Sequence, residues 1–364
     1  MHLRIQNQPP LRSPGLASDI FGENLTSLGV RHTGLCSKMS STMKSAAAVV
    51  ACLLCLLGVA AAARDYVREE EMALNPVHVR LHNDDLGQTT WMAGESDFFQ
   101  GKTLQEAKAL MGTRLGGGAN EGEAVRTFDH IDDGDIPDEF DARAQWPGLI
   151  HPIRNQEKCG SCWAFGAVES LGDRFAIATN ASSPVLSPED LVSCDELSLG
   201  CLGGFISMAW RYIESVGVVT ERCFPYAAGE GNAPPCPPKG QCVSKSAEYK
   251  KYRTSDHYRL DTVEDIQKAI MTGGPVEGGF EVHQSFMHYK SGVYSREWWK
   301  FWDPELGGHA IKIIGWGNQN GTDYWLVANS WGTDWGLDGY FKIKKGVNEC
   351  DIESSVYAGD PLLA

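Results

Sequence analysis

Residues 155–165 read Asn-Gln-Glu-Lys-Cys-Gly-Ser-Cys-Trp-Ala-Phe, and the two cysteines in this stretch, Cys159 and Cys162, decide how the rest of the chain is interpreted. A Cys-x-x-Cys pair can be a redox motif, half of a metal site, two disulfide cysteines, or one disulfide cysteine beside a free thiol. A metal site would need a second pair of cysteines or histidines at ligand spacing, which is missing. A redox motif would need a strand–turn–helix context that the later strands do not supply. In the remaining interpretation Cys162 is free at a helix start, where aligned backbone N–H groups favour a thiolate.

A thiolate that performs acyl transfer also needs an imidazole and a group that orients the imidazole. His309 follows two glycines at the entry to an apolar strand, and Asn329 lies twenty residues later at the end of another strand. Two adjacent strands could place these side chains together. Taken singly, a histidine beside glycine is more often a loop residue and an asparagine before serine is more often a turn former, so only the combination with the cysteine motif points to catalysis.

The segment Cys159–Trp163 resembles the nucleophile signature of the papain and cathepsin family of cysteine peptidases. Residues 307–310, 324–332 and 346–350 look like the cathepsin B-like branch of that family, and residues 91–94 and 110–112 are similar to its short propeptide. The resemblance covers most of residues 85–360.

This resemblance implies an α+β class and a papain-like two-lobed fold, with a helical N-terminal lobe, a β-barrel-like C-terminal lobe and the active site in the cleft between them. The residue pattern agrees, because a helical, cysteine-rich half precedes a strand-rich half. Helices are predicted over 163–177, from Ser187 towards Cys194, over 205–216 and after Thr262; strands are predicted over 279–282, 310–316, 324–328 and 339–344.

Carried over by position, the resemblance makes Cys162 the nucleophile and His309 its ion-pair partner and general acid/base. Asn329 would orient His309, and Trp331 would shield their contact from water. Gln156 would donate its side-chain amide to the oxyanion, together with the backbone N–H of Cys162.

The same resemblance implies the substrate-binding residues. Gly203 and Gly204 would offer an extended backbone edge to a peptide, with no side chain to block its approach, and Gly308 and Trp331 would line the cleft. Ser355 stands where the branch often has an acid at the base of the S2 pocket, so apolar P2 side chains should be preferred over Arg. Leu202 replaces the usual Asn, with no effect that we can derive.

Disulfides are implied between Cys159 and Cys201, between Cys194 and Cys236 and between Cys223 and Cys242, with Cys350 unpaired. The spacing of Cys236 and Cys242 differs from that of the branch.

One departure bears on the activity. Residues 224–248 contain no His, whereas cathepsin B carries there a loop with a His-His pair that docks a substrate's C-terminal carboxylate. We therefore expect a cysteine-type endopeptidase, made as a zymogen, in preference to a dipeptidyl carboxypeptidase. The alternative from another class is a catalytically inactive homologue that binds peptides or matrix proteins in the same cleft.

The order of the chain suggests four segments. Residues 1–42 are a leader of unknown role, and residues 43–63 have the form of a signal peptide, with a membrane anchor as the alternative. Residues 64–135 are expected to be an inhibitory propeptide with a helix over 104–111, and residues 136–364 the mature peptidase domain. The acidic stretch 129–138 is expected to be an exposed processing linker.

Charge and cysteine content limit the partners. The net charge of −15 argues against nucleic acid, and no metal or other cofactor is expected. The expected partners are peptide and protein substrates, the chain's own propeptide as inhibitor, and cystatin-like inhibitors, with the protein a monomer. Eight of the 11 cysteines follow residue 150, which suits the secretory pathway and a lysosomal, vacuolar or extracellular destination.

Overall fold

The computed structural model describes residues 71–84, 90–116, 122–182, 184–296 and 303–363. The predicted leader and signal peptide lie outside these ranges. Within the part of the chain that the model describes, no helix is both long enough and apolar enough to cross a bilayer.

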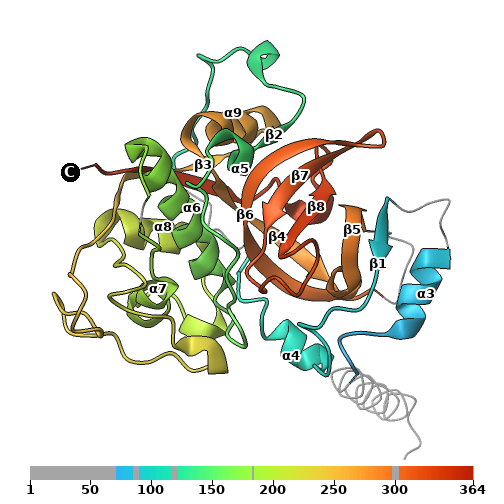
Figure 1. Ribbon diagram of the computed structural model, residues 1–364, viewed down its shortest axis with the longest axis horizontal. Helices are drawn as coiled ribbons and strands as arrows, with labels where there is room; N and C mark the ends of the chain where they lie inside the picture. Colours follow the sequence, from blue (N-terminus) through green and yellow to red (C-terminus); the bar gives the residue numbers. More distant parts are fainter. Residues whose placement is uncertain (1–70, 85–89, 117–121, 183, 297–302, 364) are drawn as a thin grey trace, which may run out of the picture. The chain divides into compact units, whose positions relative to one another are not determined.

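The first lobe is helical and is built around α6 (Cys162–Thr179), with α7 (Pro188–Cys194) and α8 (Ile206–Ser215) beside it (Figure 1). The Ser187 side chain caps α7 by accepting the backbone N–H of Asp190 at 3.2 Å. A short 3-10 turn, η2 (Gly200–Leu202), lies between α7 and α8, and a second one, η3 (Ala228–Glu230), follows α8. This lobe has its own apolar core, which includes Trp163 and Trp210.

Helix α6 is almost fully buried and packs directly on the second lobe. The close approach depends on Gly166, because a β-carbon there would lie 2.7 Å from a carboxylate oxygen of Glu277 on β4. The helix ends at Asn180 in a left-handed conformation. Its buried position holds the N-terminus, and hence Cys162, against the neighbouring sheet.

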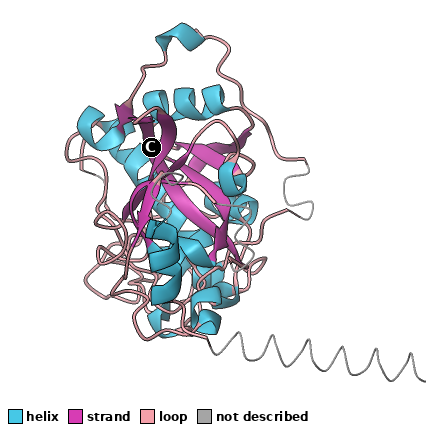
Figure 2. Cartoon of the chain, turned by 90° about the vertical axis from the view of Figure 1, so that its right-hand side faces the viewer, coloured by secondary structure: helices cyan, strands magenta, loops and turns pink. Residues whose placement is uncertain are grey.

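The second lobe is a strongly paired sheet around a second core, and Figure 2 shows its strands gathered together with helices around them. Its strand order is β1-β5-β8-β7-β6-β4-β9-β3, and β2 also pairs with β6. Among the named strands of the described residues, β5 and β8 pair in parallel and the other pairs are antiparallel. The strands are β1 (Trp91–Ala93), β2 (Phe140–Asp141), β3 (Thr254–Leu260), β4 (Val276–His283), β5 (Tyr289–Tyr294), β6 (Glu305–Gln319), β7 (Thr322–Ala328), β8 (Tyr340–Lys344) and β9 (Val356–Pro361).

Short helical elements complete this lobe. They are η1 (Asp133–Asp135), α5 (Ala142–Gln145), α9 (Val263–Gly273), η4 (Gln284–His288) and η5 (Glu349–Asp351). As predicted, α9 begins after Thr262, whose side chain accepts the backbone N–H of Asp265 at 3.0 Å. Lys268 of α9 pairs with Asp133 at 2.6 Å, so the exposed acidic stretch is anchored to the sheet lobe at this point.

Residues 71–116 run across the sheet lobe and enter the region between the lobes. They form α3 (Pro76–Asp84), β1, which adds to the edge of β5, and α4 (Leu104–Lys108). Helix α4 has a complete capping box made by Thr103 and Glu106. It is shorter than the predicted 104–111, because residues 109–111 turn tightly towards the active-site region.

The two-lobed α+β prediction is confirmed. The structure has disulfides Cys159–Cys201, Cys194–Cys236 and Cys223–Cys242, the pairs that the resemblance implied, and Cys162 and Cys350 are free. Five of these strands were not predicted: β1, β2, β3, β5 and β9.

Candidate active site

Cys162 is the first residue of α6 and is fully buried. Its sulfur lies 3.1 Å from the hydroxyl of Thr113, a residue of the segment that enters between the lobes. The backbone groups of Gly112, Trp163 and Ala310 also make hydrogen bonds to it. The thiol therefore sits at the junction of three parts of the chain.

In this state, in which residues 112–114 cover the sulfur, the thiol is not activated. We call it the covered state. Burial raises the pKa of Cys162, although its hydrogen bonds, first among them the one with Thr113, oppose the rise. The sequence predicted a thiolate stabilised by the helix N-terminus. That effect is outweighed here because the segment around Thr113 excludes water from the sulfur, and desolvation disfavours the charged form.

His309 lies on β6, opposite Phe280 of β4, and its Nε2 is 2.8 Å from the Oδ1 of Asn329. Its Nδ1 is buried and has no hydrogen-bond partner among the described residues. The Trp331 ring covers the imidazole at a centroid distance of 4.7 Å. Burial lowers the pKa of His309 to about 4, and the bond to Asn329 only partly offsets this. Imidazole and thiol are therefore both neutral in this state.

Both ends of the Gln156 side-chain amide are engaged in hydrogen bonds. Its Nε2 donates to the carbonyl oxygens of Leu110, at 3.0 Å, and Cys159, at 2.9 Å. Its Oε1 accepts the hydroxyl of Ser330 at 2.7 Å, which fixes which end of the amide donates. The donor that would face an oxyanion is thus engaged by a carbonyl of the entering segment.

Residues 112–114 bind to backbone on both walls of the cleft. Arg114 N–H donates to Gly204 O, and Gly204 N–H donates to Gly112 O, both at 2.9 Å. On the other wall Thr113 N–H donates to Gly308 O at 3.0 Å. A β-carbon on Gly308 would lie 2.2 Å from the carbonyl oxygen of Thr113, so only glycine permits this contact.

Two further glycines set how deeply the segment lies. A β-carbon on Gly112 would lie 1.7 Å from the carbonyl oxygen of Gly160, and one on Gly203 would lie 2.4 Å from that of Gly112. Gly203 also has a φ of 112°, which disfavours other residues. The segment crosses the Cys-x-x-Cys turn in backbone-to-backbone contact.

The Leu115 side chain lies against Gly279, close to Ile206 and Ser355. A β-carbon on Gly279 would lie 2.7 Å from Leu115, 2.9 Å from Ile206 and 3.6 Å from the Ser355 β-carbon, so these side chains surround one point. Leu115 also lies against Gly308. An apolar side chain of the entering segment therefore lies next to Ser355.

The structure brings Gln156, Cys162, His309 and Asn329 into the region between the lobes, with Trp331 over the imidazole and the glycines along the cleft walls. Leu202 is 81% exposed just before this edge. Sequence reasoning missed Ser330, and it did not identify the residues of the entering segment that occupy the site, Leu110, Thr113 and Leu115. No short-range motif marks these contacts. Among the described residues, no cluster of His, Cys, Asp or Glu could hold a metal ion.

Comparison with known proteins gives concordant matches. The model of the papain family cysteine proteases matches residues 136–359. A cathepsin B-like cysteine proteinase of Caenorhabditis elegans is 39% identical over 332 residues, covering 84% of this chain and 88% of its own. Cathepsin B-like CP2 of Giardia intestinalis is 38% identical over 273 residues, covering 74% of this chain and 89% of its own. The solved structure of procathepsin B S9 from Trypanosoma congolense superimposes with a TM-score of 0.72 at 34% identity, covering 80% of this chain and all of its own.

Proposed function

Because the chain belongs to the papain family of cysteine proteases, among its cathepsin B-like members, we propose that it is the zymogen of a thiol endopeptidase with Cys162 as nucleophile. The observation that carries the proposal is the position of Cys162. Its sulfur lies at the start of a buried helix, directly beneath residues 112–114 of a segment that fills the cleft.

In the uncovered enzyme, the proton of Cys162 passes to His309, and the pair becomes thiolate and imidazolium. The thiolate attacks the carbonyl carbon of the scissile bond. The oxyanion that forms accepts hydrogen bonds from the side-chain amide of Gln156 and from the backbone N–H of Cys162. His309 then donates its proton to the leaving amine, and a water molecule, deprotonated by His309, hydrolyses the thioester. Asn329 orients the imidazole throughout, because its Oδ1 accepts a hydrogen bond from Nε2–H of His309.

Residues 64–135 act as the inhibitory propeptide. The segment presents the hydroxyl of Thr113 and the backbone of Gly112 to the sulfur, while the Gln156 donor is engaged by the carbonyl oxygen of Leu110. The nucleophile and the oxyanion donor therefore meet different residues of the segment. Procathepsin neighbours of this chain, such as the one from Trypanosoma congolense, support such an intramolecular inhibitor.

Endopeptidase activity is favoured over removal of C-terminal dipeptides. Cys223–Cys242 closes a loop of sequence separation 19, and the residues within it include no His and hence no imidazolium for a substrate carboxylate. Leu115 of the entering segment lies next to Ser355, where the resemblance puts the S2 pocket, so apolar P2 residues are preferred over Arg.

Three disulfides suit an oxidising compartment, so we place the protein in the secretory pathway, with a lysosomal, vacuolar or extracellular destination. Peptide and protein substrates are the partners of the cleft, and cystatin-like inhibitors would bind there too. We assume a monomer.

The decisive experiment is to acidify the purified full chain, add an epoxide label for thiol peptidases and map the adduct by mass spectrometry. We expect modification of Cys162 together with peptide hydrolysis that Cys162→Ala abolishes. Cys350, the other free cysteine among the described residues, serves as the internal control for non-specific labelling. Hydrolysis that persists in Cys162→Ala would refute the assignment, and intact cleft binding without labelling or hydrolysis would favour the inactive homologue.

A further inference from the structure

Strand β3 is the last strand in the order of the sheet. A segment that precedes the mature domain in the sequence forms backbone hydrogen bonds to it. Val125 pairs in parallel with Arg259. Arg126 N–H donates to Arg259 O at 3.0 Å, and Arg259 N–H donates to Ala124 O at 2.8 Å. Through this one parallel bridge the backbone of residues 124–126 adds to the edge of β3, in the way that peptides commonly add a strand to a sheet.

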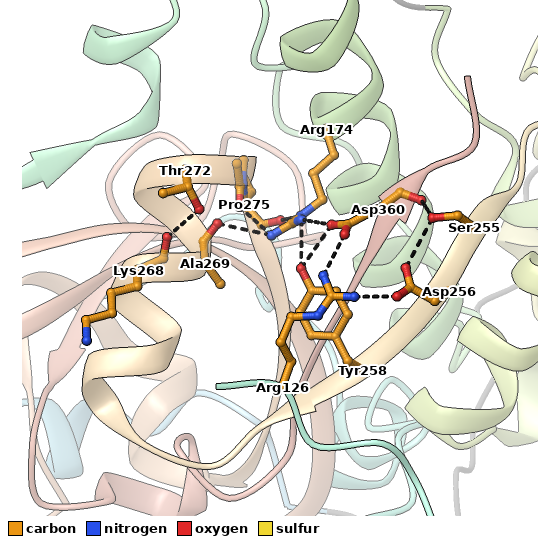
Figure 3. A network of polar contacts seen from close by, with 11 residues as sticks. Arg126, Arg174, Ser255, Asp256, Tyr258, Lys268, Ala269, Thr272, Pro275 and Asp360 are labelled. Carbon is orange, nitrogen blue, oxygen red and sulfur yellow. Dashed lines mark hydrogen bonds and ion pairs between the residues drawn. The ribbon is translucent and has the colours of Figure 1, made fainter. Parts of the chain in front are cut away.

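Arg126 is held by two acids and an aromatic ring (Figure 3). Its guanidinium lies 3.6 Å from the centroid of the Tyr258 ring and pairs with Asp360 at 2.5 Å and with Asp256. A planar cation stacked on tyrosine between two carboxylates is a geometry that arginine satisfies and lysine does not. The Arg126 side chain is only 29% exposed.

This arginine site does not depend on Arg126 for its shape. From the other side, the buried Arg174 of α6 donates to the Tyr258 hydroxyl at 3.2 Å and pairs with Asp360 at 3.5 Å (Figure 3). Tyr258 itself donates to Asp360 at 3.2 Å. Arg174 is fixed in turn by the carbonyl oxygen of Pro275 at 2.9 Å. Asp360 and the Tyr258 ring therefore keep these partners when Arg126 leaves.

An anion site lies on the opposite face of the same added strand. The Glu123 side chain is 4% exposed and pairs with Arg211 of α8 at 2.6 Å and with His257 of β3 at 2.8 Å. His257 also contacts Glu214 of α8, which orients the ring independently of Glu123. Glu123 and Arg126 thus enter two different, oppositely charged sites.

An apolar slot completes the surface. Phe128 is 8% exposed, belongs to the core cluster of the sheet lobe and meets Tyr258 at a centroid distance of 6.5 Å. Its backbone N–H donates to the Asp265 side chain at 2.8 Å. The ring therefore inserts deeply enough to anchor the strand.

We propose that the edge of β3 is a second peptide-binding site, separate from the catalytic cleft. It takes an extended segment with an acidic residue, an arginine three positions later and an aromatic residue two positions after that. Residues 123–128 fill it in the intact chain. Once they are displaced or removed, a peptide of the same pattern binds in their place.

The test uses the full chain carrying Cys162→Ala, so that its outcome is independent of any peptidase activity. Two variants serve as open-site receptors. In the first, residues 123–128 are replaced by a glycine–serine linker of equal length. The second carries only Glu123→Ala and Arg126→Pro, which together remove both charges and one backbone hydrogen-bond donor. The probe is a fluorescein-labelled peptide of residues 122–130, Gly-Glu-Ala-Val-Arg-Thr-Phe-Asp-His, followed by anisotropy. Circular dichroism checks that both receptors are folded.

We expect saturable binding to the open-site receptors and at least about tenfold weaker binding to the chain that retains its own segment, because a tethered segment competes at roughly millimolar effective concentration. A peptide with Glu and Arg exchanged keeps the composition and should bind about tenfold more weakly. Asp256→Ala in the open receptor should also weaken binding, since Asp256 is 48% exposed and its loss spares the core. Equal affinity for the exchanged peptide, or no binding to either folded open receptor, would overturn the proposal.

Discussion

Trp91 is the residue whose truncation should most clearly release the inhibitory segment. Its ring is 4% exposed and lies 3.8 Å from the His82 ring, 5.0 Å from Tyr294 and 6.2 Å from Tyr289 by centroid distance. Its indole N–H donates to Ser295 O at 3.1 Å. It thus joins β1 to the sheet lobe without touching the catalytic groups.

Replacing a buried Trp by Ala costs about 3 to 5 kcal/mol. If this free energy is lost from the covered state only, the population of uncovered chain rises roughly 100- to 3,000-fold, since each 1.4 kcal/mol is a factor of ten. We therefore expect Trp91→Ala to speed epoxide labelling of Cys162 at neutral pH by about that factor.

The assay is the labelling rate of the full chain at low label concentration, where opening is in rapid equilibrium. Met92→Ala is the matched control, because Met92 lies on the same strand and is 42% exposed. Once the propeptide is removed, Trp91→Ala and the unmodified chain should have the same kcat/KM. Labelling of Trp91→Ala at the rate of Met92→Ala would refute the idea that β1 holds the propeptide closed.

Three other predictions concern the site and its control. Gln156→Ala should lower kcat of the activated enzyme by about 100- to 1,000-fold with little change in KM, as for the loss of one oxyanion donor; an effect confined to KM would contradict the role. Ser355→Glu should raise kcat/KM for Arg at P2 relative to Leu in a P2-varied peptide series, because it adds a carboxylate beside the pocket; unchanged selectivity would contradict our placement of that pocket. His288 is 2% exposed, accepts the Asn75 N–H of the propeptide at 3.3 Å, and burial lowers its pKa to about 4, against about 6.5 in water. Above about pH 6.5 His288 is neutral in both forms, whereas between about pH 6.5 and 4 only the uncovered form readily binds a proton, so the covered form loses relative stability as pH falls. Cys162 labelling should therefore accelerate across that window, and less steeply in His288→Gln than in the unmodified chain.

The helices of the first lobe could be predicted because their signals are local. The helix expected over 163–177 is α6, and the cap at Ser187 starts α7 as expected. Strand β1 has only three residues and exists because it pairs with β5, about two hundred residues away. Strand β3, with the sequence Thr-Ser-Asp-His-Tyr-Arg-Leu, has too few apolar residues to be distinguished from a loop. Two of its polar side chains, Asp256 and His257, contact the segment bound along its edge.

The resemblance supplied the candidate catalytic residues, but the state of the thiol could not be predicted. A helix N-terminus is visible in the sequence, whereas the contact of Cys162 with Thr113 joins residues 49 positions apart. The burial of the sulfur beneath this segment raises the thiol's pKa, against the expected direction, while the hydrogen bond with Thr113 itself opposes the rise. The role of Ser330 in fixing Gln156 was equally invisible, because it depends on the fold bringing together residues 174 positions apart.

The buried guanidinium of Arg174 has a consequence for how the molecule could be regulated. Cys162 and Arg174 are twelve residues apart on α6, about 18 Å along its axis, and nearly all of the helix between them is buried. An axial displacement of α6 would therefore move the nucleophile and the support of the arginine site together. If a peptide at the β3 edge favours one position of this helix, it changes substrate affinity in the cleft by some factor. Substrate must then change the affinity of the edge by the same factor, so inhibitor titrations could detect the coupling from either end.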